Sequence, residues 1–311
     1  MAASALLPAA ARAAGVARPL AVVATTGMIA DGVARIGGDQ VEIHGLMGAG
    51  VDPHSYRQTR SDIVAMSRAD LVLWHGLYLE AQMEEFFADL SRKREVVAVA
   101  EVLTADRLLS HPAYEGRYDP HVWMAPPLWG DVLAGIADVL VAKRPEAEEL
   151  FASNRDDLLS DVAGIDAYAR HIFARLDPEQ RVLVTAHDAF SYFGREYGFE
   201  VIGIQGISTE SEAGLNRVGE LVDLLVERGI RAAFVESSVS DRNIRALIEG
   251  AAARGHEVKI GGELFSDAMG VPGTYEGTYI GMMDHNLTTI ARALGADVDP
   301  LGWQGKLRAG S

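Results

Sequence analysis

The sequence predicts an α/β protein of two lobes, each a mainly parallel sheet with covering helices, joined by one long linker helix. Three observations predict this fold. Short β-branched runs alternate with longer helical patterns in both halves of the chain. One amphipathic stretch separates the halves, and 311 residues suffice for roughly two domains. We expect lobes at residues 16–143 and 179–311, with the linker at 144–178.

The elements follow in order along the chain. In the N-terminal half, short apolar runs predict strands at 20–24, 41–46, 71–74 and 96–98, and helical periodicity predicts helices at 28–36, 61–67, 80–90 and 128–142. In the C-terminal half, the same criteria predict strands at 182–186, 201–204, 232–235 and 258–260, and helices at 189–196, 215–228, 241–253 and 282–294. Each half should therefore carry about four strands covered by helices.

The stretch between the halves predicts the linker helix. Apolar residues from Leu150 and Phe151 to Phe173 recur at three- and four-residue steps, and a proline stands at each end, Pro145 and Pro178. This pattern predicts an amphipathic helix of about thirty residues, which would span about 45 Å. A single helix of this length makes a stiff connection and disfavours a wide hinge opening between the lobes.

Composition excludes several classes of partner. The net charge of −16 argues against nucleic acid and anionic membranes as partners. The absence of cysteine excludes disulfides, thiolate metal sites and a lipid-modified N-terminal cysteine in this sequence. No apolar run approaches the roughly 18 residues of a membrane span.

The first residues are small and apolar, with Ala11-Arg12-Ala13 as an A-x-A cleavage pattern. Residues 1–15 are therefore expected to be the remnant of a signal peptide, and a disordered alanine-rich tail is the alternative.

Four side chains from separate loops suggest a metal site. His54 and His121 each close an Asp-Pro-His tripeptide, and His187 follows a short apolar run at nearly the same interval. Asp267 follows later, after the predicted strand at 258–260. Three imidazoles and one carboxylate can bind one first-row metal ion. In an open α/β sheet such loops gather outside the carboxyl ends of the strands, which here means between the lobes.

Each of these residues also has a simpler interpretation. A histidine after proline is often only a turn residue, and Asp267 alone could be a helix cap. Asp52 and Asp119 either cap their own turns, which we slightly favour, or orient the imidazoles that follow them. His187 should lie at the start of a helix, whose positive N-terminus would favour the neutral, metal-binding imidazole.

Three other histidines receive weaker assignments. His75 should be a structural loop residue, and His285 should be packed or solvated. His111 could make a transient metal contact.

Longer motifs carry more information than the spacing. They are DPHSY, ADLVLWHGLYLE, DPHVWMAP, TAHDAFSYFGREYGFEVIGIQGIST, FVESSVSDRNI and ELFSDAMG followed by GTYEGTYIGMMDHNL. Together these resemble, in matching order from about residue 19 to residue 294, the cluster A-I metal-binding proteins of ABC importers. These are the periplasmic zinc and manganese solute-binding proteins, and the TroA-like branch is the most similar. The resemblance implies His54, His121, His187 and Asp267 as the metal ligands, with the third position occupied by His or Glu in different members.

The resemblance also implies a function. The protein would be a periplasmic monomer that captures Zn²⁺ or Mn²⁺ and delivers it to an ABC permease in the inner membrane, and it would not be an enzyme. Two departures from the family pattern matter. Region 102–119 holds only His111 where many zinc-specific members carry a His-rich loop, so the choice between zinc and manganese stays open. The cysteine that anchors some members is absent, which implies a protein without a lipid anchor.

Two other classes of protein are compatible with parts of the sequence. A metallohydrolase with a three-His-one-Asp zinc centre is the alternative, with Glu236 or Glu212 as its general base. Glu236, however, stands beside a buried strand end, which favours a structural role for it. Such a centre needs an open position for water, and the sequence has no HExxH or GxSxG motif. A metal-independent interaction protein is compatible with the acidic surface, but no motif points to it.

Overall fold

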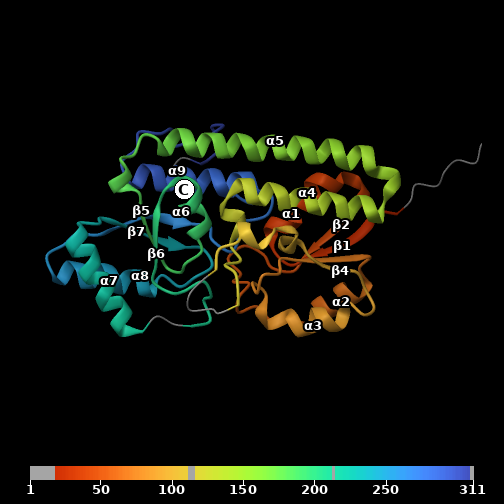
Figure 1. Ribbon diagram of the computed structural model, residues 1–311, viewed down its shortest axis with the longest axis horizontal. Coiled ribbons are helices and arrows are strands. Elements are labelled where there is room, and N and C mark those ends of the chain that lie inside the picture. Colours follow the sequence, from red (N-terminus) through yellow and green to blue (C-terminus); the bar gives the residue numbers. More distant parts are fainter. Residues whose placement is uncertain (1–17, 111–115, 212–213, 309–311) are drawn as a thin grey trace, which may run out of the picture.

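The computed structural model describes residues 18–110, 116–211 and 214–308 of the chain. Two α/β lobes lie side by side, and the helix α5 (Glu148–Phe173) runs along one side of both (Figure 1). The predicted fold class is therefore confirmed. The expected signal-peptide remnant at 1–15 lies outside the described residues.

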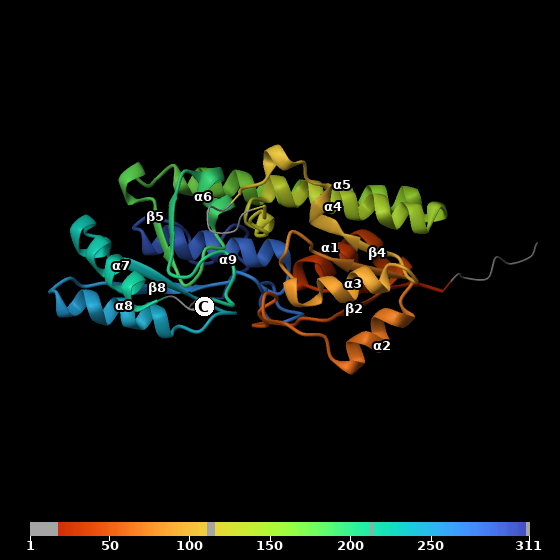
Figure 2. The ribbon, with the colours of Figure 1, turned by 60° about the horizontal axis from the view of Figure 1, so that its bottom comes forward.

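The N-terminal lobe contains one parallel sheet in the order β2-β1-β3-β4. Its strands are β1 (Leu20–Ala24), β2 (Val41–Gly45), β3 (Leu71–Trp74) and β4 (Val96–Ala98). Its helices are α1 (Gly27–Gly37), α2 (Arg60–Arg68), α3 (Glu84–Leu90) and α4 (Pro126–Lys143). Figure 1 shows α1 and α4 on the α5 side of the sheet and α3 on the other side, and α2 lies on the side away from α5 in both views (Figures 1 and 2). The sheet is thus covered on both faces, as parallel sheets require, which fits the continuous apolar runs of β1 and β3.

Local sequence signals set several helix boundaries. Thr59 and Asp62 form a capping box at the start of α2, in which each side chain accepts a hydrogen bond from the other's backbone N–H. Two prolines open α4, where the missing N–H groups cost no helical hydrogen bond. Gly198, with a φ of 72°, ends the helix α6 (Ser191–Tyr197) in the left-handed conformation that glycine adopts readily.

The C-terminal lobe contains two parallel pairs of strands where a single sheet was expected. Strand β5 (Val182–Thr185) pairs with β6 (Glu200–Gly203), and β7 (Ala232–Glu236) pairs with β8 (Lys259–Leu264). Strands β5 and β7 lie in contact, so the four strands still form one layer. The helices are α6 (Ser191–Tyr197), α7 (Leu215–Arg228), α8 (Arg242–Ala253) and α9 (Tyr279–Ala293).

Short 3-10 helices complete the described elements. They are η1 (Gly38–Gln40), η2 (Ala81–Met83), η3 (Val99–Val102), η4 (Ala105–Arg107), η5 (Val122–Met124), η6 (Pro145–Ala147) and η7 (Pro178–Gln180).

Helix α5 has 26 residues, slightly fewer than expected, because its first turn is the 3-10 helix η6 and it ends before Pro178. Phe151 and Phe173 are buried as the periodicity predicted, whereas Leu150 is 40% exposed and lies outside the buried face. One apolar cluster runs from the N-terminal lobe through α5 into the C-terminal lobe and includes Ile29, Phe151 and Met283. A close-packed core shared by both lobes opposes a wide separation of them.

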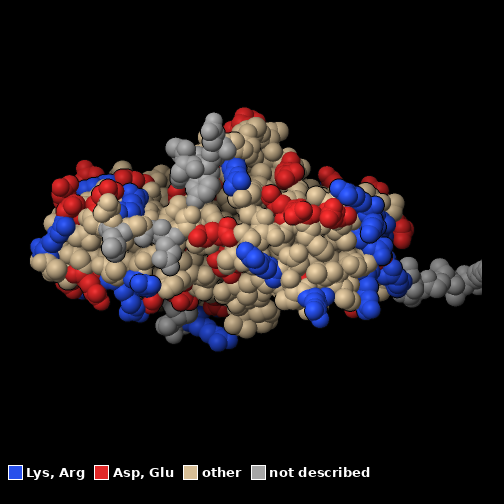
Figure 3. Space-filling model, turned by 90° about the horizontal axis from the view of Figure 1, so that it is seen from below, with Lys and Arg blue, Asp and Glu red and all other residues tan. Residues whose placement is uncertain are grey.

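Charged side chains of both signs are spread over the face in Figure 3. Basic side chains gather mainly at the outer end of the N-terminal lobe, while acidic ones form several separate groups. Within the described residues, no helix is both long and apolar enough to cross a bilayer.

Candidate metal centre

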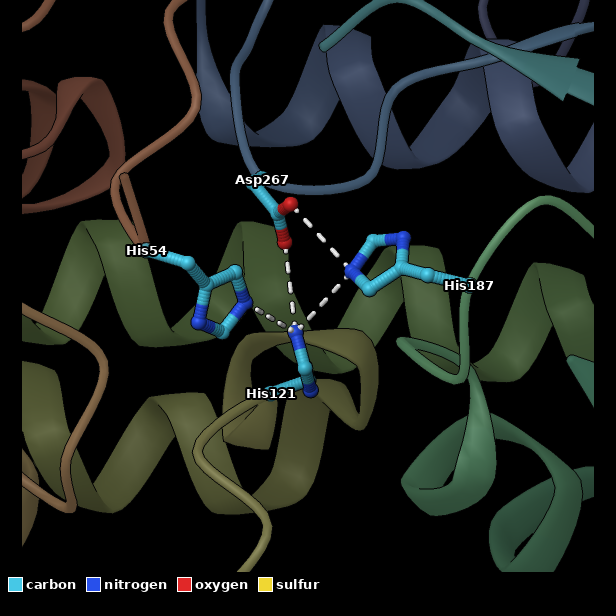
Figure 4. Close-up of side chains that lie close together, drawn as sticks. All are labelled: His54, His121, His187 and Asp267. Atoms are coloured by element: carbon cyan, nitrogen blue, oxygen red, sulfur yellow. Dashed lines mark hydrogen bonds and ion pairs between the residues drawn. The ribbon is translucent and has the colours of Figure 1, made fainter. Parts of the chain in front are cut away.

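The four predicted residues lie at one point between the lobes (Figure 4). His54 lies in the turn after β2, and His121 immediately precedes η5. His187 follows the end of β5 by two residues, and Asp267 follows the end of β8 by three. Two ligand candidates thus come from each lobe, and those of the C-terminal lobe lie beyond the carboxyl ends of parallel strands, as expected.

The distances fit a single metal ion. His121 Nε2 lies 3.3 Å from both His54 Nε2 and His187 Nε2. Asp267 Oδ1 lies 3.3 Å from His121 Nε2, and Asp267 Oδ2 lies 3.2 Å from His187 Nε2. A tetrahedral ion with bonds of about 2.0–2.1 Å separates its ligand atoms by roughly 3.3–3.4 Å. These four contacts therefore match the spacing of a coordination shell, and one ligand atom from each of the four residues lies within 4.8 Å of the others.

Burial makes these contacts unusual without a cation. All four residues are at most 2% exposed. Asp267 Oδ1 is buried without a hydrogen-bond donor, which is costly for a carboxylate oxygen. A divalent ion among the rings would satisfy this oxygen. Among the described residues, no other group of His, Cys, Asp and Glu has such geometry.

Asp119 orients the ring of His121. Its Oδ1 lies 2.7 Å from His121 Nδ1 and also accepts the His121 backbone N–H at 2.9 Å. A proton held on Nδ1 by this carboxylate leaves the Nε2 lone pair free for a metal. Asp119 therefore both caps its turn and orients the imidazole.

Asp52 has a different role, although it begins the same tripeptide. Its Oδ1 accepts the His54 backbone N–H at 2.8 Å, which caps the turn as we expected. Among the described residues, His54 Nδ1 has no carboxylate partner. His54 is thus held by its backbone, whereas His121 is also held by its ring.

Glu236 orients the ring of His187. Its Oε2 lies 2.6 Å from His187 Nδ1, and its Oε1 accepts the His187 backbone N–H at 2.9 Å. Glu236 is the last residue of β7, beside β5. From the sequence, Glu236 was a candidate base for the enzyme alternative, and a structural role beside a buried strand end was favoured for it. An acidic residue ending a buried strand was the available signal for its role at the site.

The predicted setting of His187 needs a correction. Helix α6 begins at Ser191, and Phe190 is its N-cap residue, so His187 is not at the helix N-terminus. The dipole of α6 therefore does not determine the protonation of this imidazole, because the effect falls off within one turn. The contacting carboxylates determine it.

The other histidines have the roles that we expected. His75 is fully buried, and its Nε2 lies 2.7 Å from the Pro120 carbonyl, so it supports the His121 turn from the interior. His285 is buried, with its Nε2 2.8 Å from the Glu263 carbonyl. The candidates His111 and Glu212 lie outside the described residues.

The electrostatics of the site favour positive charge. Burial lowers the pKa of His54 to about 3. Burial also opposes charge on His121, but the carboxylates of Asp119 and Asp267 outweigh it and raise the pKa of His121 to about 9. Asp267 and Glu236 likewise overcome burial and hold the pKa of His187 well above its usual value. The pKa of Asp267 lies well below its usual value despite burial, because His187 and His121 stabilise its charge. Buried carboxylates thus attract about two positive charges, which one divalent ion can supply.

Replacing Glu236 by glutamine should weaken metal binding about 10- to 100-fold, because the neutral amide no longer increases the basicity of His187. Competition with a chromophoric chelator measures this change. Glu263→Gln, which removes the same charge from an exposed position on β8, is the matched control and should bind metal normally. Equal weakening in both variants would mean that net charge, and not the contact with His187, causes the effect.

Comparison with known proteins identifies the family. The model of the family described as zinc-uptake complex component A periplasmic (ZnuA) matches residues 22–293. The manganese-binding lipoprotein MntA of Bacillus subtilis is 48% identical over 276 residues, which cover 88% of this chain and 90% of MntA. The zinc-binding protein TroA of Treponema pallidum is 47% identical over 277 residues, with 89% of each chain covered.

The solved structure of the periplasmic zinc-binding protein TroA from Treponema pallidum superimposes with a TM-score of 0.87 at 46% identity. It covers 89% of this chain and 99% of that one. Family model, sequence identity and fold agree over nearly the whole described chain. The chain therefore belongs to the ZnuA family, the zinc-uptake complex component A proteins of the periplasm.

Proposed function

We propose that this protein captures one divalent zinc or manganese ion through His54, His121, His187 and Asp267 and delivers it to the permease of an ABC importer. The observation that carries the proposal is the cluster of four buried residues, whose ligand atoms lie within 4.8 Å of one another and make four contacts of 3.2 to 3.3 Å. Two of its imidazoles are also oriented by carboxylates, an arrangement typical of metal sites. The metal is cargo, bound to be passed on.

The same site argues for a binding protein and against an enzyme. Four protein ligands fill a tetrahedral shell, whereas a catalytic zinc keeps one position open for water. Glu236, the described candidate for a general base, is engaged by both its oxygens with His187. The metallohydrolase alternative therefore lacks support.

Zinc and manganese are both compatible with the donor atoms. Nitrogen and oxygen donors without sulfur suit either ion. Asp267 faces the rings with both oxygens, and a bidentate carboxylate would raise the coordination number and favour manganese. The relatives differ in the same respect, since MntA is named manganese-binding and TroA zinc-binding. Elemental analysis of protein purified without added metal distinguishes the two ions.

The remaining parts of the proposal concern organisation and setting. We propose lobes at 16–143 and 179–311 joined by the linker at 144–178. The protein acts as a monomer in the periplasm, and its partner is a permease in the inner membrane. Nucleic acid is not among its partners, since the chain carries a net charge of −16.

Titration of metal-free protein should show one tight divalent ion per chain. Because the ion binds the folded state, it should also raise the melting temperature, and an ion at 100 times its Kd stabilises the fold by about 2.7 kcal/mol. Calorimetric titration with Zn²⁺ and Mn²⁺, together with thermal unfolding, measures both quantities. Absence of tight binding by either ion would refute the proposed function, and two tight sites would refute the single four-ligand cluster.

A further inference from the structure

We propose that Thr209 is a positioning residue for metal retention, which holds His54 in place through Asp52 across the cleft between the lobes. The proposal rests on the function proposed above, with His54 as a metal ligand. It concerns how long the metal stays bound.

His54 depends on its turn more than the other two histidines do. Carboxylates hold the rings of His121 and His187. Asp52, in contrast, contacts His54 only at its backbone N–H and not at its ring. The orientation of the His54 imidazole therefore follows from the geometry of its turn. A residue that fixes Asp52 also fixes the His54 ring.

Thr209 provides such a contact from the opposite lobe. Its Oγ1 donates a hydrogen bond to Asp52 Oδ2 at 2.6 Å, and the same oxygen accepts the Ser55 hydroxyl at 3.0 Å. The other oxygen of Asp52 binds the His54 backbone. One carboxylate therefore links Thr209 of the C-terminal lobe to the turn that presents His54.

The segment that carries Thr209 is tied to the strand end beside His187. The Gln205 backbone N–H donates to the Ala186 carbonyl at 3.0 Å, and the Asp188 N–H donates to the Gly206 carbonyl at 3.2 Å. The buried Gln205 side chain binds the Ser211 carbonyl at 3.0 Å, which folds the segment back on itself. The Thr209 hydroxyl is thus fixed relative to His187. Its hydrogen bond to Asp52 therefore fixes the position of His54 in the N-terminal lobe relative to His187 in the C-terminal lobe.

The same segment covers the side of the site next to His54. A cavity of about 10 Å³ lies there, lined in part by His54, Tyr78, Pro120, Ile207 and Ser208. This volume holds about one water molecule at most. Ile207 and Ser208 precede Thr209 directly, so release of Thr209 from Asp52 frees both the His54 turn and the wall of this cavity. Loss of the Thr209 bond should therefore speed the escape of metal.

A second contact across the cleft provides a control. Gln82 Nε2 donates to Glu210 Oε1 at 2.5 Å, one residue away from Thr209. Gln82 lies in η2 and has no hydrogen bond to the His54 turn in the described structure. Its removal weakens the contact between the lobes without touching Asp52.

The test is the rate at which Zn²⁺-loaded protein loses its metal to excess chelator in a stopped-flow experiment. Thr209→Val keeps the side-chain shape and removes the hydrogen-bond donor. It should release metal about tenfold faster, as expected when a hydrogen bond that supports a metal ligand is lost. Thr209→Ser restores the donor and should return the wild-type rate. Gln82→Ala should release metal at the wild-type rate. Thr209→Ala replaces the valine variant if thermal unfolding shows that the latter is not folded.

Three results would overturn the inference. They are a wild-type rate in Thr209→Val, an equal acceleration in Gln82→Ala, and failure of Thr209→Ser to restore the rate. A wild-type rate in Thr209→Val would show that the hydrogen bond to Asp52 does not slow metal release. Equal acceleration in Gln82→Ala would show that loss of any contact between the lobes speeds release. Failure of the serine variant would show that the hydroxyl group is not responsible for the slow release. Failure of the proposed function is distinguishable, because the wild-type protein would then bind no Zn²⁺ at all.

Discussion

Replacing His121 by alanine should abolish tight metal binding while the protein stays folded. His121 is the central residue of the cluster, with its Nε2 within 3.3 Å of three other donor atoms. Its loss removes one ligand and leaves the buried Asp119 carboxylate with the backbone N–H of residue 121 but without the imidazole. The affinity should fall by more than the roughly 10- to 100-fold that loss of an outer hydrogen-bond partner costs. Calorimetric titration measures the affinity, and circular dichroism checks the fold.

Two other histidines serve as controls for this variant. His44 is exposed on β2, and His285 packs against Phe265 away from the cluster. His44→Ala and His285→Ala should both bind metal as the wild type does. If His285→Ala lost binding to the same extent as His121→Ala, the assignment of ligands among the nine histidines would be wrong.

The fold was accessible from the sequence because its signals are local. Strands β1, β3 and β4 are short apolar runs, and each has the predicted bounds. The linker helix was visible because one apolar face persists over many turns. The division of the C-terminal strands into two pairs was not visible, because pairing depends on contacts between segments far apart in sequence.

At the site, too, the sequence predicted what depends on neighbouring residues and not what depends on residues far apart in the chain. The tripeptide at 52–54 and its copy at 119–121 identified two ligand candidates, but the sequence could not distinguish Asp52 from Asp119. Both aspartates cap their turns, yet only Asp119 reaches the ring of its histidine. Glu236 was missed as an orienting residue because its partner, His187, lies on a different strand end. Such roles depend on the path of the folded chain, and no spacing in the sequence encodes them.

Metal affinity should depend steeply on pH, through competition between protons and metal for the same nitrogen atoms. An unperturbed histidine, with a pKa of about 6.5, would compete only in acid. In this site, buried carboxylates raise the pKa of His121 to about 9 and hold that of His187 well above its usual value. A raised pKa means that the metal-free protein binds the proton more tightly. Competition therefore begins at higher pH, and affinity should already fall as the pH drops from 9 towards 7.

The number of protons released distinguishes this account from simple titration of three histidines. His54, whose pKa is lowered to about 3, is neutral before metal arrives and releases none. We therefore expect about two protons per metal ion at neutral pH, and affinity should then change by roughly 100-fold per pH unit. Calorimetry in buffers of different ionisation enthalpy counts these protons. Glu236→Gln should reduce the count, since it removes a carboxylate that raises the pKa of His187. A proton count near zero in the wild-type protein would mean that the imidazoles are neutral in the metal-free site.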